Sequence, residues 1–222
     1  MEYDIRGGDS YPVLEVALQP GEEVVAESGA MCWMDQHVQC KTAARGGVLA
    51  SMKRKLLTGE SLFQNTYSVE REPGMVGLVA GAPGTIVPYD HQGDELYLEK
   101  GAYLASGPGV KIDAKFDGLK GLFNEGLFVM KTSGTGPLFF SGYGDVRMVE
   151  VDGTYKVDNG YAVAWDTSLS YKLTKAKKIR SFLFGDQLIL EFRGQGRLWV
   201  QSRSAQALAN FFHPYRPVQN NN

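Results

Sequence analysis

Three stretches of this chain repeat one pattern: VVAESGAMCWM at residues 24–34, LYLEKGAYLAS at 96–106 and YKVDNGYAVAW at 155–165. In each stretch apolar and polar residues alternate, a short polar turn ends in glycine, and a second alternating segment follows. Alternation with a period of two is typical of β-strands that bury one face. The chain is therefore expected to contain one pair of β-strands in three versions.

Structural turns are predicted at Gly29, Gly101 and Gly160, where each stretch changes direction. The third turn, Asn159-Gly160, is typical of a two-residue type I′ turn, in which both residues adopt positive φ. Each stretch is therefore expected to fold back on itself as a hairpin. Counting outward from the turns gives the cross-strand partners: Ala26 with Met31, Leu98 with Tyr103, and Val157 with Ala162.

A second shared element consists of EGLFVMKTSGTGPLFFS at 125–141 and DQLILEFRGQGRLWVQS at 186–202, with ESLFQNTYSVEREPGMVGLVA at 60–80 as a looser version. The two elements recur with nearly the same spacing, which indicates internal duplication. We expect a single compact β domain over residues 1–222, made of three internal repeats and a short C-terminal tail. The repeats span about 10–82, 83–143 and 144–204, and the tail spans 205–222.

Each repeat supplies several short strands separated by turn signals, a pattern typical of an all-β sandwich or small barrel. The predicted fold is all-β, with three tandem β-sandwich or short double-stranded β-helix units related by a pseudo-threefold arrangement. Stacking the units leaves the outer edges of the first and third units bare, and natural proteins rarely leave long apolar edges uncovered. A head-to-tail contact closes a ring when its rotation closes. We therefore expect a homotrimer with nine units around a ring.

Three segments also resemble a known family: VLEVALQPGEEVVAESGAM at 13–31, GESLFQNTYS at 59–68 and GLFNEGLFVMKTSGTGPLFFSGYG at 121–144. The chain is similar over nearly its whole length to short bacterial members of the altered-inheritance-of-mitochondria family, also called the mitochondrial biogenesis family. The resemblance implies a triplicated β unit similar to the tryptophan RNA-binding attenuation protein, with trimers that form a pseudo-ninefold ring. It implies a poorly defined role, which for eukaryotic relatives is mitochondrial inner-membrane organisation. This chain departs from those relatives because it has no transit-like N-terminus.

The composition is that of an ordinary globular protein, with 43% hydrophobic residues, 22% charged residues and a net charge of -2. That charge argues against a surface wholly devoted to nucleic acid or anionic lipid. Neither a signal peptide nor a long apolar segment is apparent, so we expect a cytoplasmic protein. Cys32 and Cys40 are too few for a disulfide framework, and we expect small, buried or half-buried thiols. Short helices are predicted at ASMKRKLL, residues 50–57, and SAQALANFFHPYR, residues 204–216.

No catalytic or metal-binding pattern emerges from the sequence. His37, His91 and His213 lie in separate segments without metal-ligand spacing, and His91 reads as a solvated turn residue. The G-x-G pairs in SGTGP and RGQGR are followed by strands rather than helices, so they are read as hairpin turns and not phosphate loops. We therefore predict a non-enzymatic protein without a cofactor, catalytic residue or metal site.

Basic residues gather in the segments between the paired strands and form a candidate anion or nucleic-acid surface. They are Lys53, Arg54, Lys55, Lys111, Lys115, Lys120, Lys175, Lys177, Lys178 and Arg180. A ring would multiply them into a band that attracts phosphates with a steep salt dependence. Simple solubility of long loops explains the same charges. Nearby aromatic residues can stack on bases or anchor the loops to the core: Phe116, Phe123, Phe182 and Phe184.

The leading hypothesis is a non-enzymatic oligomeric β-ring that acts as a scaffold or binding protein. One alternative is RNA or other polyanion binding through the basic segments. Another is a cupin-like small-molecule or metal-binding protein, although the sequence identifies no small-molecule ligand. Membrane association through Met52, Leu56 and Leu57 beside the first basic cluster is kept as a weaker alternative.

Overall fold

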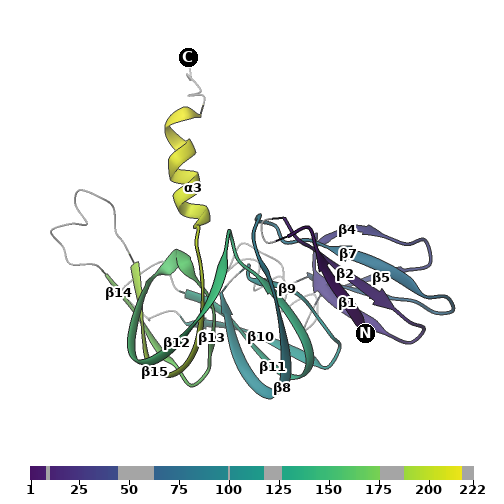
Figure 1. Ribbon diagram of the computed structural model, residues 1–222, viewed down its shortest axis with the longest axis horizontal. Helices are drawn as coiled ribbons and strands as arrows, with labels where there is room; N and C mark the ends of the chain where they lie inside the picture. The colour runs from purple at the N-terminus through teal and green to yellow at the C-terminus, as the bar shows by residue number, and fades with distance from the viewer. Residues whose placement is uncertain (9–10, 45–62, 100, 118–126, 176–187, 217–222) are drawn as a thin grey trace.

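The computed structural model describes residues 1–8, 11–44, 63–99, 101–117, 127–175 and 188–216 (Figure 1). Most of these residues lie in β-strands, so the all-β prediction is confirmed. The predicted C-terminal helix is also confirmed as α3, Ala205–Phe212, which stands away from the strands in Figure 1. Its N-cap is Ser204, whose side chain accepts a hydrogen bond from the Ala207 backbone N–H. The predicted helix at residues 50–57 lies outside the described residues.

The strands form two sheets with antiparallel pairing throughout. The smaller sheet has the order β1-β2-β7-β4. Its strands are β1 (Glu2–Arg6), β2 (Val13–Leu18), β7 (Gly74–Leu78) and β4 (Met31–Met34).

The larger sheet has the order β12-β15-β13-β8-β11-β9-β3-β6-β5, with β10 paired to β11 and β14 paired to β15. Its strands are β3 (Glu23–Glu27), β5 (Gln39–Ala44), β6 (Phe63–Ser68), β8 (Ile86–Glu99), β9 (Tyr103–Ser106), β10 (Val110–Asp117), β11 (Leu127–Ser141), β12 (Val146–Asp158), β13 (Ala162–Asp166), β14 (Ser170–Lys175) and β15 (Leu188–Gln201).

One pairing scheme recurs in three successive segments, which we call the first (13–78), second (86–141) and third (146–201) segments. In each, the final strand pairs with the opening strand and with the strand that follows the glycine turn. The register in the second of these pairings shifts once per segment, beside Cys32, Leu104 and Val163. A bulge at the same place in every segment bends the strand after the turn in the same way.

The predicted hairpins about the glycine turns are wrong. Ala26 on β3 pairs with β6 and β9 rather than with β4, and Leu98 on β8 pairs with β11 and β13 rather than with β9. Val157 on β12 pairs with Leu190 on β15. The alternation before and after each turn shows only that both strands bury one face. In the structure the strands before and after each glycine turn do not pair with each other.

The type I′ turn predicted at Asn159-Gly160 is also wrong. Residues Asn159–Tyr161 form a 3₁₀ turn, and the Asp158 carboxylate accepts a hydrogen bond of 3.3 Å from the Gly160 N–H. Positive φ is found at Gly29 (93°) and Gly101 (85°), but not at Gly160 or at any non-glycine residue that the structure describes. The aspartate cap stabilises a turn that needs no left-handed residue.

The G-x-G pairs lie within long strands rather than at hairpin turns. β11 and β15 run continuously through them, and Gly134 has a φ of 104°. A Cβ at Gly134 would collide with the Gly109 carbonyl oxygen on the neighbouring chain segment, so glycine is required for this close approach. The corresponding strand in the first segment is interrupted, which leaves β6 and β7 as separate strands.

Adjacent segments are joined by strand pairing in one fixed register. At the first junction Ala26 on β3 pairs with Ala105 on β9, and at the second Leu98 on β8 pairs with Ala164 on β13. Ala26 and Leu98 each lie three residues before a turn glycine, and Ala105 and Ala164 each lie four residues after one. The second junction therefore repeats the first, residue by residue.

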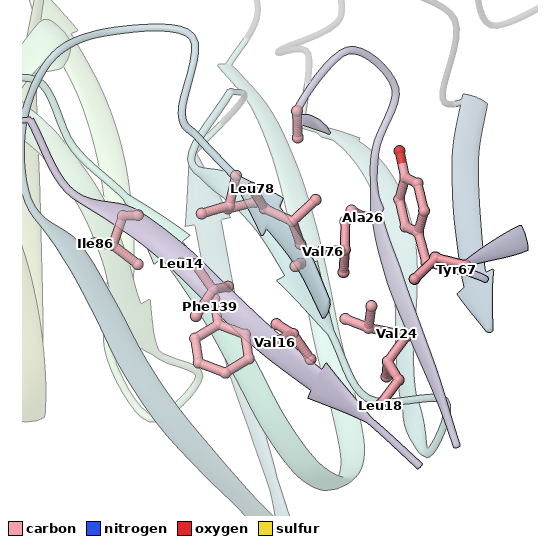
Figure 2. Close-up of a cluster of buried hydrophobic side chains, with 14 of the residues drawn as sticks. Leu14, Val16, Leu18, Val24, Ala26, Tyr67, Val76, Leu78, Ile86 and Phe139 are labelled. Atoms are coloured by element: carbon pink, nitrogen blue, oxygen red, sulfur yellow. The ribbon is translucent and has the colours of Figure 1, made fainter. Parts of the chain in front are cut away.

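The hydrophobic core crosses these junctions. The first cluster contains Leu14, Val24 and Leu78 from the first segment together with Ala105 and Phe139 from the second. Figure 2 shows side chains from β2 and β7 facing those from β3 and β6, with Phe139 beside Leu14. A second cluster joins the second and third segments in the same manner. The cores hold the segments in line because each is completed by the segment that follows.

Candidate functional site at the open strand edges

The strand after the glycine turn is buried in two segments and exposed in one. β9 is buried along its whole length, and β13 is buried up to Trp165. β4 occupies the same place in the first segment, yet Met31, Trp33 and Met34 are 38%, 37% and 40% exposed. β9 and β13 are covered by β3 and β8, whereas within the described ranges β4 pairs with β7 alone. The sequence MCWM is as apolar as those of β9 and β13. β4 therefore has the composition of a buried strand but lies at an open edge of its sheet.

The residue pair formed by β4 and its neighbouring strand has a side-chain volume similar to that of the corresponding pairs in the other two segments. Trp33 pairs directly with Gly77, and a Cβ at Gly77 would collide with the Trp33 ring. At the same place the second segment pairs Ala105 with Phe139, and the third pairs Ala164 with Trp199. Each pair thus combines one aromatic side chain with one small residue.

In the second and third segments the aromatic side chain lies on the final strand and is buried, Phe139 at 0% and Trp199 at 7% exposure. In the first segment it lies on β4 as Trp33 and remains exposed to solvent. Trp33 therefore differs from its aromatic counterparts because no described strand covers it at the edge of β4.

The opposite end of the chain carries a complementary open edge at residues 155–158 of β12. The same stretch of β3 and of β8 has strands on both sides, but in the part of the chain that the structure describes this stretch pairs only with β15. Val157 points toward a cluster with Leu190 and Leu198. Lys156 points to solvent and its Nζ lies 3.2 Å from Glu191 Oε2. The edge therefore has an apolar face and a charged face.

A polar network locks the second segment to the third. Arg197 on β15 makes two hydrogen bonds with the Asp166 carboxylate, of 2.8 and 3.0 Å, and a third of 2.9 Å to the Tyr89 hydroxyl oxygen on β8. Its guanidinium carbon lies 5.3 Å from the ring centroids of both Tyr89 and Trp199. Hydrogen bonding with Asp166 raises the pKa of Arg197. The network has bidentate geometry and ties two segments at their junction.

Tyr89 donates its hydroxyl proton to Asp94, which extends the network along β8. Burial raises the pKa of Tyr89 to about 12, and the hydrogen bond to Asp94 adds to that rise. Burial by itself raises the pKa of Asp94, but hydrogen bonds from Tyr89 and His91 outweigh it and hold this pKa at about 2. Asp94 is therefore a carboxylate at neutral pH and accepts from both neighbours.

The prediction that His91 is a solvated turn residue is wrong. His91 lies within β8 and is 1% exposed, with its Nδ1 3.1 Å from Asp94 Oδ1 and its Nε2 2.9 Å from Thr132 Oγ1. Thr132 is itself buried and donates to the Leu96 carbonyl oxygen. The three residues have the types of a nucleophile, base and acid, but burial of Thr132 and His91 removes them from any substrate. His91 and Thr132 satisfy each other inside the core, and the half-buried Asp94 contacts His91 from the edge of it.

A half-open cavity of about 300 Å³ lies at the foot of α3, where all three segments meet. Its polar lining comes from Glu27, Glu99, Ser141, Tyr143 and Gln201. Gln201 is held by hydrogen bonds from the Tyr143 N–H and to the Gly160 carbonyl oxygen. Two carboxylates in the lining favour an amine or hydroxyl group over an anion.

The structure brings few of the sequence-predicted site residues into view. Lys111 is exposed on β10, and Lys115 and Lys175 lie in strands β10 and β14 without a described side chain. The remaining basic residues lie outside the described residues: Lys53, Arg54, Lys55, Lys120, Lys177, Lys178 and Arg180. The hydrophobic residues 52, 56 and 57 lie outside them as well.

The two cysteines are free thiols, and both are exposed, so the prediction of buried or half-buried thiols is wrong. Cys32 is exposed because it lies on the uncovered β4, whereas its counterparts Leu104 and Val163 are buried. Its Sγ donates a hydrogen bond of 3.3 Å to the Gly77 carbonyl oxygen. The only helix among the described residues with an exposed apolar stripe is α3, with Leu208, Phe211 and Phe212.

Comparison with known proteins identifies relatives over the full length of this chain. The family model described as mitochondrial biogenesis AIM24 matches residues 3–203. An uncharacterised protein of Streptococcus pyogenes serotype M6 is 28% identical over 232 residues, which cover 100% of this chain and 93% of the relative. A crystal structure of a Streptococcus pyogenes protein has a TM-score of 0.82 at 26% identity and covers 97% of this chain and 99% of that chain. Within the described residues no helix is long and apolar enough to span a membrane.

Proposed function

We propose that this chain, which belongs to the mitochondrial biogenesis AIM24 family, is a non-enzymatic scaffold or binding protein that assembles with copies of itself. The observation that carries the proposal is the pair of open edges. β4 exposes the face that its counterparts bury, and the end of β12 lacks the neighbour that its counterparts have among the described strands. Exposed apolar strand edges promote association unless they are covered. Self-association covers both at once.

We propose three tandem β units, related by a pseudo-threefold arrangement and similar to the tryptophan RNA-binding attenuation protein. The recurring register of the three segments and of the two junctions supports the tandem units. A contact between unlike ends of identical chains is heterologous and forms either a closed ring or an open fibre. The choice of a ring of three chains rests on the family resemblance in the sequence.

A non-enzymatic role is supported by the polar groups that sequence reasoning overlooked. Arg197, Asp166, Tyr89 and Asp94 bind one another, and His91 is enclosed with Thr132. The hydrogen bond from Arg197 to Tyr89 joins the third segment to the second, and the other contacts stabilise one segment each, which is a structural task. RNA binding and a cupin-like activity stay predictions, because the residues that carry the first lie mostly outside the described ranges.

Light scattering after gel filtration tests self-association directly. We expect the unaltered protein at micromolar concentration to have three times the chain mass of 24.4 kDa, and Trp33→Lys to have the mass of one chain. Phe211→Lys is the matched control, because it places the same charge on the other exposed apolar surface, α3. A single-chain mass for the unaltered protein would end the proposal. A single-chain mass for Phe211→Lys alone would move the contact to α3.

A further inference from the structure

We infer that β4 of one chain pairs antiparallel with residues 155–158 of β12 in the next chain, with Trp33 opposite Val157 and Met34 opposite Lys156. The partner is thus a second copy of this chain, bound through one defined edge in one register. This inference rests on the proposed self-association and adds the surface and the register that the association uses.

The register follows from the two junctions inside the chain. At each, a residue three positions before a turn glycine pairs with a residue four positions after the next turn glycine: Ala26 with Ala105, and Leu98 with Ala164. Three positions before Gly160 lies Val157, and four positions after Gly29 lies Trp33. The adjacent pairs agree, because Val25 pairs with Ser106 and Tyr97 pairs with Trp165. Their counterparts are Lys156 and Met34.

The cores lead to the same partner. The first two clusters each end on the bulged strand of the following segment: Leu104 and Ala105 in the first cluster, Val163 and Ala164 in the second. The third cluster contains Val157, Leu190 and Leu198, and no further segment follows it among the residues that the structure describes. Cys32 and Trp33 of another copy are the residues that would complete it. Both are exposed in the single chain.

Registers shifted by one residue would place the Trp33 face of β4 on the charged face of β12. Sliding β4 by one residue would turn the Trp33 ring to the face that carries Lys156 and would leave the third cluster open. A one-residue slip in an antiparallel pair reverses every side chain, so a buried face specifies the register strongly. The paired edges are also both short, as are the internal junctions, where β9 meets β3 over two residue pairs and β13 meets β8 over three.

Disulfide trapping tests the register in a Cys32→Ser, Cys40→Ser background. Opposed Cβ atoms in an antiparallel pair lie about 5 Å apart and can be bridged. We expect Met34→Cys with Lys156→Cys to oxidise into species of two and three chain masses on non-reducing gels. The off-register pair Trp33→Cys with Lys156→Cys places the thiols on opposite faces and should cross-link at least about tenfold more slowly.

A second in-register pair, Trp33→Cys with Val157→Cys, tests the same register on the buried face of the two strands. Its result does not depend on how the substitution at residue 34 is tolerated. Equal cross-linking of the in-register and off-register pairs would overturn the register. Failure of both in-register pairs in a background that still has three chain masses by light scattering would overturn the edge while leaving the scaffold proposal standing. A background with a single-chain mass would remove both proposals.

Discussion

β4 and β9 occupy the same place in two segments of one chain, and they differ in what lies beside them. β9 is paired on both sides and completely buried, while β4 is paired with β7 and exposes three large apolar side chains. Their local bulges and their pairings with the final strand of the segment correspond. The difference therefore comes from the end of the repeat array and not from the strand itself. In a chain built from duplicated β segments, the pairing at each internal junction predicts how the two terminal edges pair between copies.

The largest difference between the two strands is expected when one charge is placed in each. Ala105→Asp buries an unpaired carboxylate in β9 and should cost at least about 4 kcal/mol, so that the chain does not fold stably. Trp33→Asp at the same place in β4 should cost about 1 to 2 kcal/mol, from lost packing on Gly77, and leave a folded monomer. Circular dichroism with urea unfolding measures both. Equal losses would show that β4 already has its full set of contacts.

The exchange of volume between Trp33 and Gly77 gives the next largest effect. Gly77→Phe forces a ring into the space of Trp33 and should destabilise the chain by about 3 kcal/mol. Adding Trp33→Ala recreates the Ala105 and Phe139 arrangement of the second segment, so the double variant should recover most of that loss. Urea unfolding at one fixed protein concentration makes the comparison, because assembly itself adds stability. Additive losses in the double variant would contradict the correspondence between the two segments.

The network at the second junction should contribute less than core packing. Asp166→Ala removes two hydrogen bonds from the Arg197 side chain and a third of 2.7 Å from the Arg197 backbone N–H. We expect a loss of about 2 kcal/mol. Asp152→Ala is the control, since Asp152 is exposed and accepts one hydrogen bond from Gln195. If both variants lose the same stability, the network does not lock the junction.

Titration of Asp94 should give the smallest effect. The folded pKa of about 2 lies below the ordinary value of 3.8, so the ionised carboxylate stabilises the fold. This stabilisation is present above about pH 4 and is lost as the pH falls toward 2. The urea midpoint of the unaltered protein should therefore fall more steeply between pH 4 and pH 2 than that of Asp94→Asn. If the urea midpoints of the two proteins change in parallel with pH, ionised Asp94 does not stabilise the junction.

Sequence patterns predicted the all-β fold and the turns at Gly29 and Gly101, because alternation and turn chemistry are local. They gave the wrong partners for Ala26, Leu98 and Val157, since alternation shows which face of a strand is buried and not which strand covers it. The junction partner of Ala26 lies in another segment, seventy-nine positions along the chain.

The residues around His91 were missed for a similar reason. Asp94 lies three positions away, but Thr132 reaches the same place through the pairing of β8 with β11. Arg197 reaches it because β13 lies between β8 and β15 and pairs with both. The correspondence of Trp33 and Gly77 with Ala105 and Phe139 was visible in principle, as an exchange of large and small residues between aligned repeats. Recognising it required knowing that those positions pair.

The pairing of β4 with another chain is tested most directly by comparing the amide hydrogen exchange of β4 with that of β9. If β12 of another chain pairs with β4, the peptides that cover residues 31–34 and 155–158 should exchange slowly in the unaltered protein. Protection should approach that of residues 103–106 and be lost at both places together in Trp33→Lys. Rapid exchange at residues 31–34 in the unaltered protein, with residues 103–106 protected, would show that β4 is bare in solution and would contradict pairing through this edge.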